Sequence, residues 1–202
     1  MSDFVHEWVR GESAVTVLSL HGTGGTERDL IPLSQTLFPG ANVLAPRGRV
    51  SERGANRFFR RFAEGVFDLD DLRQQTDALA EFVSAKSREY GFDAARVWAL
   101  GYSNGANIAA SLLLQRPQTL ADAVLLRAMT PFVPQNLPKL AGKRVFLAAG
   151  RFDPIVAPAD VERLTQLLRA SGAEAELRFA EVGHELTGDD IEAAKAWLGA
   201  EN

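Results

Sequence analysis

The amino-acid sequence predicts an α/β fold, with a mostly parallel central sheet of about seven strands flanked by helices. Short apolar runs rich in Val, Leu and Ala recur along the chain, which is typical of parallel strands buried on both faces. Longer amphipathic stretches separate these runs, as expected for helices that join strands by right-handed crossovers. A chain of 202 residues buries a large core as one unit, so we expect residues 1–202 to form a single domain.

Seven segments are predicted to be strands. Six are apolar runs, at residues 14–20, 41–45, 96–100, 121–126, 144–149 and 176–182. The seventh, residues 4–9, comes before a turn-like stretch at residues 10–13, so we expect it to pair antiparallel with the first run as an edge hairpin.

Five amphipathic stretches are predicted to be helices, at residues 28–37, 70–90, 104–115, 158–170 and 189–198. Pro158 suits a first helical turn, Pro117 follows the end of the third helix, and Gly172 suits the left-handed position after a helix. Residues 46–67 and 127–142 fit neither helix nor strand, and both follow strands. Loops at the carboxyl ends of parallel strands form the ligand crevice of an open α/β sheet, so we expect these two stretches to border the site.

Charge and composition exclude several classes of protein. The chain has 22 Lys and Arg against 26 Asp and Glu, and a net charge of -4 argues against a nucleic-acid binder. The absence of Cys excludes disulfides, a thiolate nucleophile and a Cys-ligated metal. The first ten residues lack the apolar run of a signal peptide, and no stretch reaches the roughly 20 apolar residues of a membrane span. We therefore expect a soluble, cytoplasmic protein with no membrane partner.

The most specific motif is Gly-Tyr-Ser-Asn-Gly at residues 101–105, which matches G-x-S-x-G between a predicted strand and a predicted helix. In this motif the Ser sits on a turn so tight that only Gly on either side leaves room for the strand and helix to cross. The following helix aims its N-terminal N–H groups at the same place. Ser103 is therefore the candidate nucleophile; the alternative is a Gly-rich turn in which a Ser caps a helix.

A Ser nucleophile needs a base, and the chain has only three His. His6 and His21 lie in or at the end of predicted strands, which leaves His184, just after the last strand. The acid that orients the base is expected to end a strand between nucleophile and His, and Asp153 meets this condition. By themselves, a lone His and a turn Asp are more often structural, but their order after Ser103 favours a triad.

Two backbone N–H groups are expected to bind the oxyanion of an acyl-transfer intermediate. One belongs to Asn104, the residue after the nucleophile, and the other to Thr23, in the loop after the first central strand. His21, in the same loop, is expected to order the loop rather than to act as a base.

Motifs for other chemistries are incomplete. Residues 22–25 are Gly-rich, but Glu27 stands where the dinucleotide fingerprint needs Gly, and there is no Gly-Lys-Ser/Thr phosphate loop. The two His-Glu pairs lack the second His of a zinc protease. We therefore expect neither a cofactor nor a metal.

Four motifs together carry a resemblance to a known family: His-Gly-Thr-Gly-Gly, Gly-Tyr-Ser-Asn-Gly-Ala, Gly-Arg-Phe-Asp-Pro-Ile-Val and Gly-His-Glu-Leu. From about residue 19 to residue 198 the chain resembles the carboxylesterase/phospholipase family of small α/β hydrolases, related to acyl-protein thioesterases, and in particular its bacterial methylhydroquinone-resistance branch. The resemblance implies an α/β-hydrolase fold without a cap domain and a metal-independent serine hydrolase of short acyl esters or thioesters. It implies the same roles for Ser103, Asp153, His184, Thr23 and Asn104.

The chain departs from the thioesterase members at residues 57–62, Arg-Phe-Phe-Arg-Arg-Phe, where they have a Trp-Phe-Asp segment. We expect a helical turn that places Phe58, Phe59 and Phe62 on one side, most simply packed on the core. The functional hypothesis is that an Arg of this segment binds a substrate carboxylate, because guanidinium suits bidentate recognition. The candidate substrate-binding residues are Arg57, Phe59, Arg60, Arg61 and, with Val133 and Leu137 as further pocket walls, Phe132.

The sequence thus predicts a carboxylesterase that forms an acyl-enzyme with a small-molecule ester. The alternatives are a thioesterase or lysophospholipase, which differ in substrate, and a ligand-sensing protein that keeps the fold. A homodimer is an open expectation.

Overall fold

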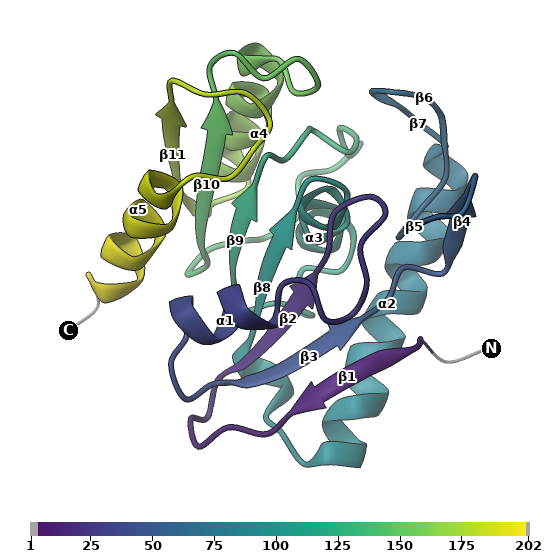
Figure 1. Ribbon diagram of the computed structural model, residues 1–202, viewed down its shortest axis with the longest axis vertical. Coiled ribbons are helices and arrows are strands. Elements are labelled where there is room, and N and C mark those ends of the chain that lie inside the picture. Colours follow the sequence, from purple (N-terminus) through teal and green to yellow (C-terminus); the bar gives the residue numbers. More distant parts are fainter. Residues whose placement is uncertain (1–3, 201–202) are drawn as a thin grey trace.

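A seven-stranded sheet forms the centre of the computed structural model, which describes residues 4–200 (Figure 1). Its order is β1-β3-β2-β8-β9-β10-β11, and every neighbouring pair is parallel except β1 and β3. The strands are β1 (His6–Val9), β2 (Thr16–Leu20), β3 (Asn42–Pro46), β8 (Val97–Tyr102), β9 (Asp122–Leu126), β10 (Arg144–Gly150) and β11 (Glu174–Ala180). The α/β-hydrolase fold and the mostly parallel sheet of seven strands are confirmed.

The predicted edge hairpin is wrong. β1 pairs with β3, with His6 opposite Pro46 and Val9 opposite Val43, rather than with β2. Both edges of β2 are occupied by parallel partners, β3 and β8, so β1 can add only at the free edge of β3.

Helices cover both faces of the sheet (Figure 1). The helices are α1 (Ile31–Leu37), α2 (Leu69–Tyr90), α3 (Asn104–Gln115), α4 (Pro158–Ala170) and α5 (Gly188–Gly199), with a short 3₁₀ turn at Ala94–Arg96. The larger core cluster joins the sheet to α2, α3 and α4, and the smaller one joins it to α1 and α5. Among residues 4–200, none of the helices combines the length and the apolar character that a bilayer crossing requires.

Residues 46–67 form two small hairpins beyond the end of β3: β4 (Val50–Glu52) with β5 (Ala55–Arg57), and β6 (Arg61–Ala63) with β7 (Val66–Phe67). The predicted helical turn at residues 57–62 is therefore wrong. Residues 58–59 form a bend between the hairpins, and side chains from two helices fix its backbone: Phe58 N–H donates to Asn104 Oδ1 at 2.7 Å, and Arg60 N–H to Asp71 Oδ2 at 2.6 Å. As a result Phe58 and Phe59 are fully buried, whereas Phe62 is 75% exposed and does not share their side.

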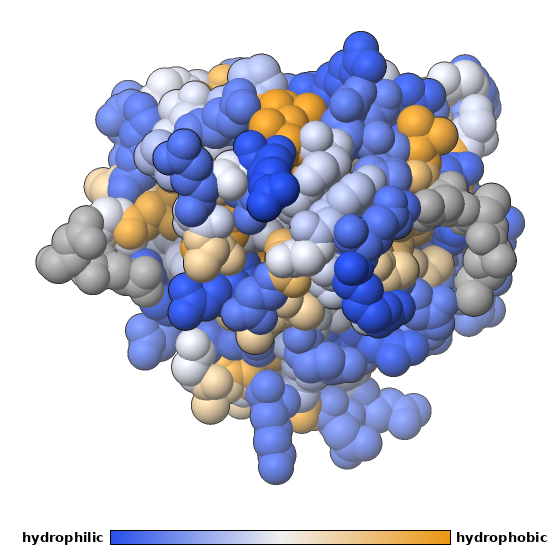
Figure 2. Space-filling model, turned by 90° about the horizontal axis from the view of Figure 1, so that it is seen from below, coloured by the Kyte–Doolittle hydropathy of each residue, from blue (hydrophilic) through white to orange (hydrophobic). Residues whose placement is uncertain are grey.

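Residues 127–142 contain no helix or strand and lie beyond the carboxyl end of β9. Asn107 of α3 fixes their start, because its Oδ1 accepts a hydrogen bond from Met129 N–H at 2.7 Å. Asn104 and Asn107 on one helix thus hold the two long segments on either side of the α3 N-terminus. The face seen from below Figure 1 is mostly hydrophilic, with apolar side chains in small separate groups, as is ordinary for a solvent-exposed surface (Figure 2).

Candidate active site

Ser103 occupies a strained turn between β8 and α3. Its φ of 52° and ψ of −114° are unfavourable for a residue with a Cβ, and the turn is held by Ser103 N–H donating to Leu126 O at 2.8 Å. A Cβ on Gly105 would lie 2.0 Å from Leu20 O, and one on Gly101 would lie 2.7 Å from the Ala106 backbone. The glycines are therefore required by the close crossing of strand and helix, which raises the Ser103 side chain above the sheet edge.

Asp153, His184 and Ser103 form a hydrogen-bonded chain. His184 Nε2 lies 2.9 Å from Ser103 Oγ, and His184 Nδ1 lies 2.7 Å from Asp153 Oδ2. The Asp153 side chain is fully buried, and its other oxygen accepts from the N–H groups of Ile155 at 2.8 Å and Val156 at 3.0 Å. A carboxylate only accepts, so Nδ1 carries the imidazole proton and Nε2 is free to accept the Ser103 proton.

The loop that carries His184 is fastened by groups that the sequence reasoning missed. Tyr102 OH donates to His184 O at 2.9 Å, and Arg127 Nη2 donates to Glu185 O at 2.6 Å. Arg127 is fully buried and also pairs with Asp190 on α5. Although burial alone would raise the pKa of Asp190, hydrogen bonds from Arg127 and Thr187 bring it below its ordinary value. In the sequence, the one feature that could have pointed to Arg127 is its position directly after a predicted strand, at the sheet edge where the site was expected.

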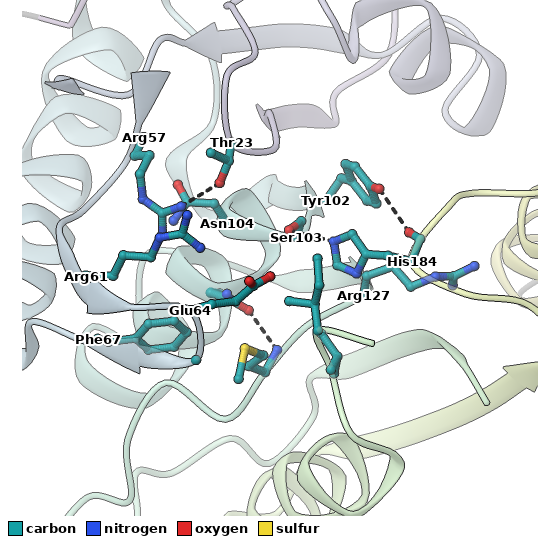
Figure 3. Close-up of a pocket in the computed structure, with 15 residues that line it drawn as sticks. Thr23, Arg57, Arg61, Glu64, Phe67, Tyr102, Ser103, Asn104, Arg127 and His184 are labelled. Carbon is teal, nitrogen blue, oxygen red and sulfur yellow. Dashed lines mark hydrogen bonds between the residues drawn. The ribbon is translucent and has the colours of Figure 1, made fainter. Parts of the chain in front are cut away.

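The N–H groups of Thr23 and Asn104 are available to a ligand. Asn104 is the first residue of α3, so its N–H has no partner within the helix. No hydrogen bond among residues 4–200 uses the Thr23 N–H either. The two residues line the same cavity as Ser103 (Figure 3).

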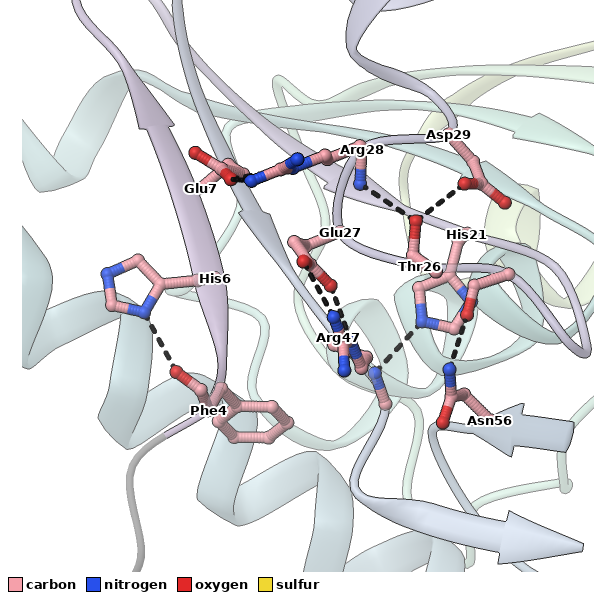
Figure 4. A network of polar contacts seen from close by, with 12 residues as sticks. Phe4, His6, Glu7, His21, Thr26, Glu27, Arg28, Asp29, Arg47 and Asn56 are labelled. Atoms are coloured by element: carbon pink, nitrogen blue, oxygen red, sulfur yellow. Dashed lines mark hydrogen bonds and ion pairs between the residues drawn. The ribbon is translucent and has the colours of Figure 1, made fainter. Parts of the chain in front are cut away.

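The Thr23 loop is ordered by His21 and its neighbours (Figure 4). His21 Nδ1 donates to Gly22 O at 2.6 Å, and Nε2 accepts from Gly48 N–H at 2.9 Å. Burial lowers the pKa of His21, and the hydrogen bond to the Gly22 carbonyl opposes this effect only in part. The lowered pKa favours the neutral ring, which can accept the hydrogen bond from Gly48 N–H. Asn56 Nδ2 adds a hydrogen bond to Gly25 O at 2.8 Å.

A cavity of about 290 Å³ opens beside Ser103 and His184 (Figure 3). Apolar groups of its lining are Phe67, Met129, Ile155 and Val156, and charged groups are Arg57, Arg61, Glu64 and Arg127. Within residues 4–200, no group of three or more His, Cys, Asp or Glu side chains is arranged to hold a metal ion.

Of the candidate substrate-binding residues, only Arg57 and Arg61 reach this cavity. Phe59 is buried against the Phe67 ring, at 5.0 Å between centroids. Arg60 is 62% exposed and pairs with Asp68 at 3.1 Å. Phe132 packs under the Arg73 guanidinium, 5.6 Å from its ring centroid.

The other two predicted pocket walls, Val133 and Leu137, are 63% and 49% exposed and also lie outside the cavity lining. The hairpins at residues 46–67, and not the segment at residues 131–138, therefore supply the aromatic and cationic wall.

Comparison with known proteins places this geometry among hydrolases. The model of the dienelactone hydrolase family matches residues 51–197. The hydrolase-like protein MhqD of Bacillus subtilis (strain 168) is 43% identical over 192 residues. The match covers 95% of this chain and 96% of MhqD.

Two solved structures extend the likeness to the whole fold. The crystal structure of the Bacillus cereus carboxylesterase has a TM-score of 0.96 and 45% sequence identity, and the match covers 98% of this chain and 94% of that one. The structure of YahD with malic acid has a TM-score of 0.92 and 32% identity, and the match covers all of both chains.

Proposed function

This chain belongs to the dienelactone hydrolase family and is a carboxylesterase-like α/β hydrolase; from that premise, we propose that it cleaves short carboxylic esters through an acyl-enzyme on Ser103. The observation that carries the proposal is the unbroken chain from Asp153 through His184 to Ser103, with hydrogen-bond distances of 2.7 and 2.9 Å. The cavity of about 290 Å³ fits a small acyl group.

Each half of the reaction uses the same groups. His184 Nε2 takes the Ser103 proton as Oγ attacks the ester carbonyl carbon, and the N–H groups of Thr23 and Asn104 bind the oxyanion that forms. His184 then gives its proton to the departing alcohol oxygen, which leaves the acyl group on Ser103. Water attacks that acyl-enzyme with His184 again as base, so one ester and one water yield one acid and one alcohol. Asp153 keeps the imidazole in the required tautomer and stabilises its charged form.

A fluorophosphonate probe and a series of p-nitrophenyl esters of increasing chain length test this proposal. We expect one probe molecule per chain, attached at Ser103, and multiple turnovers of the shorter esters. Ser103→Ala is expected to lose both properties while its circular dichroism spectrum stays that of the wild type. Probe attachment elsewhere, or turnover that survives Ser103→Ala, would contradict the assignment.

The alternatives differ from this proposal in measurable ways. Thioesters matched in acyl chain to the p-nitrophenyl esters distinguish a thioesterase, which would turn them over faster. Lysophospholipids test the lysophospholipase alternative. A ligand-sensing protein would attach the probe at Ser103 but turn over no ester. The complete triad geometry favours an enzyme over a sensor.

A further inference from the structure

The wall of the cavity opposite His184 contains a buried cation, Arg57, at the end of β5. Its side chain is 3% exposed; Nε donates to Phe59 O at 3.2 Å and Nη1 to Thr23 Oγ1 at 2.6 Å. Within residues 4–200, no hydrogen bond uses its Nη2. Burial, and to a smaller extent the charge of Arg61, lower the pKa of Arg57 to about 10, so the group stays charged at neutral pH.

The charges around Arg57 leave it incompletely neutralised. Glu52 is the carboxylate in ion-pair contact with it, with Oε2 3.6 Å from Arg57 Nε. Both oxygens of Glu52 also accept from Arg61 Nε at 3.1 Å, so one carboxylate serves two guanidinium groups. The remaining acid of the cavity wall, Glu64, lies on the exposed β6–β7 turn, where water screens its charge. A buried charge without a full counter-charge is costly, and a bound anion would relieve that cost.

The position of Arg57 relative to Ser103 and His184 decides which part of an ester it meets. His184 must protonate the leaving oxygen, so the alcohol portion lies on the His184 side of Ser103. The carbonyl oxygen points at the N–H groups of Thr23 and Asn104. Arg57 and Arg61 lie together across Ser103 from His184 (Figure 3). The substituent that extends toward them is the acyl chain.

We propose that the preferred substrates are esters whose acyl portion carries a carboxylate, that is, monoesters of small dicarboxylic acids, and that Arg57 Nη2 binds that carboxylate. The proposal rests on the proposed esterase function and names its substrate class. Because Arg57 Nη1 also holds the Thr23 side chain, the carboxylate-binding residue and the oxyanion loop are directly linked.

Three esters that differ only in the position of one carboxylate test the proposal. Ethyl butanoate is the neutral reference. Monoethyl succinate replaces the last methyl of its acyl chain with carboxylate, and O-butanoyl glycolate replaces the last methyl of its alcohol. We expect wild-type kcat/KM to be about 10- to 100-fold higher for monoethyl succinate than for the other two, the range typical of a hydrogen bond to a charged group.

Four variants separate the charge of Arg57 from its structural contacts. Arg57→Met is expected to lose the preference, and Arg57→Lys to keep part of it. Thr23→Val removes the hydrogen bond to Arg57 but keeps the charge, so it is expected to retain the preference even where the overall rate falls. Arg60→Met removes an exposed charge outside the cavity and is the matched control, with the preference unchanged.

A measurement on the unmodified protein covers the case in which Arg57→Met fails to fold. Succinate, the product diacid, is expected to inhibit wild-type hydrolysis of ethyl butanoate at least 10-fold more tightly than butanoate does. If ethyl butanoate and monoethyl succinate are hydrolysed equally well, or if Arg57→Met keeps the preference, the carboxylate site is wrong while the esterase function stands. If none of the three esters nor any p-nitrophenyl ester is turned over, the proposed function itself fails.

Discussion

Arg127 and Asp190 form a buried two-point ion pair between the end of β9 and the first turn of α5. Arg127 Nη2 lies 2.6 Å from Asp190 Oδ2 and Nη1 lies 3.0 Å from Oδ1, and the two side chains are 0% and 3% exposed. Because Nη2 also donates to Glu185 O, and Asp190 Oδ2 accepts from Thr187, the pair fastens both sides of the loop that carries His184. A contact 63 residues apart in the sequence thus fixes the position of the candidate base.

We predict that Asp190→Asn lowers both stability and turnover. Removing one partner leaves the Arg127 charge buried without its counter-ion, which costs about 3–5 kcal/mol of unfolding free energy. The freed loop lets His184 leave Ser103, so kcat is expected to fall more than KM changes. Urea denaturation and ester hydrolysis measure the two effects. Glu192→Gln, which breaks an exposed pair with Lys195 on the same helix, is the control and should behave as the wild type. Equal stability of the two variants would contradict the role given to the pair.

The same pair predicts a pH dependence. The pKa of Asp190 is lower in the folded chain than its ordinary value of 3.8, so its contribution is complete above that value and is lost as pH falls through the folded pKa. The stability gap between the wild type and Asp190→Asn is therefore expected to stay constant above about pH 4 and to narrow as pH falls further. Urea denaturation at several pH values measures it; a gap that stays constant below about pH 4 as well would show that the carboxylate charge is not what stabilises the loop.

His21 predicts a second dependence with a different window. Burial lowers its pKa below the ordinary 6.5, so the unfolded chain binds the His21 proton more readily than the folded chain does. The contribution of neutral His21 is complete above about pH 6.5 and is lost as pH falls below it. Over about pH 7 to 5 we expect the wild type to lose more unfolding free energy than His21→Gln, which keeps a hydrogen-bonding side chain but does not titrate. Parallel curves for the two proteins would contradict this.

The sequence predicted best what depends on neighbouring residues. The strand, turn and helix around Ser103 follow from five residues, and the order of strands along the chain predicted that Asp153 and His184 reach the same sheet edge. The segment at residues 57–62 was interpreted wrongly because the groups that fix its backbone, Asn104 and Asp71, belong to distant helices. Apolar periodicity contains no information about such side-chain partners.

The long loops also show that local sequence does not determine where a side chain of a loop points. Two arginines of the segment, Arg57 and Arg60, look alike in the sequence, yet one lies in the cavity wall and the other in solvent. The difference arises at the bend of residues 58–59, where hydrogen bonds to Asn104 and Asp71 fix the backbone. On either side of this bend, the Arg57 side chain bonds to Thr23 in the cavity wall and the Arg60 side chain pairs with Asp68 at the surface. Arg127 was missed for a related reason, since its partner on α5 cannot be identified from local sequence.

Asp153→Asn tests the tautomer argument directly. The N–H groups of Ile155 and Val156 donate to Asp153 Oδ1, so the variant amide would keep its oxygen there and turn its NH₂ group toward His184. Because that NH₂ group donates, His184 Nδ1 would have to accept and would carry no proton. Nε2 would then carry the proton and could not accept from Ser103. We expect kcat to fall roughly 10³- to 10⁴-fold, with little change in the melting temperature. A variant that retains a tenth or more of the wild-type rate would contradict the assigned orientation.

Gly105→Ala tests whether the strained Ser103 turn depends on close backbone crossing. The added Cβ would lie 2.0 Å from Leu20 O, an atom of β2 that cannot rotate away, so α3 must shift from the sheet. Overpacking of this kind costs about 1–3 kcal/mol of unfolding free energy, and the shift moves Ser103 and the Asn104 N–H together away from His184.

Gly188→Ala is the matched control, because a Cβ there meets no atom within 4 Å. We expect Gly105→Ala to lose stability and at least 100-fold in kcat/KM, since misplacement by about 1 Å suffices for such a loss, and Gly188→Ala to keep both. If Gly105→Ala were active and as stable as the wild type, the turn at Ser103 would not depend on the close contact between Gly105 and Leu20 O.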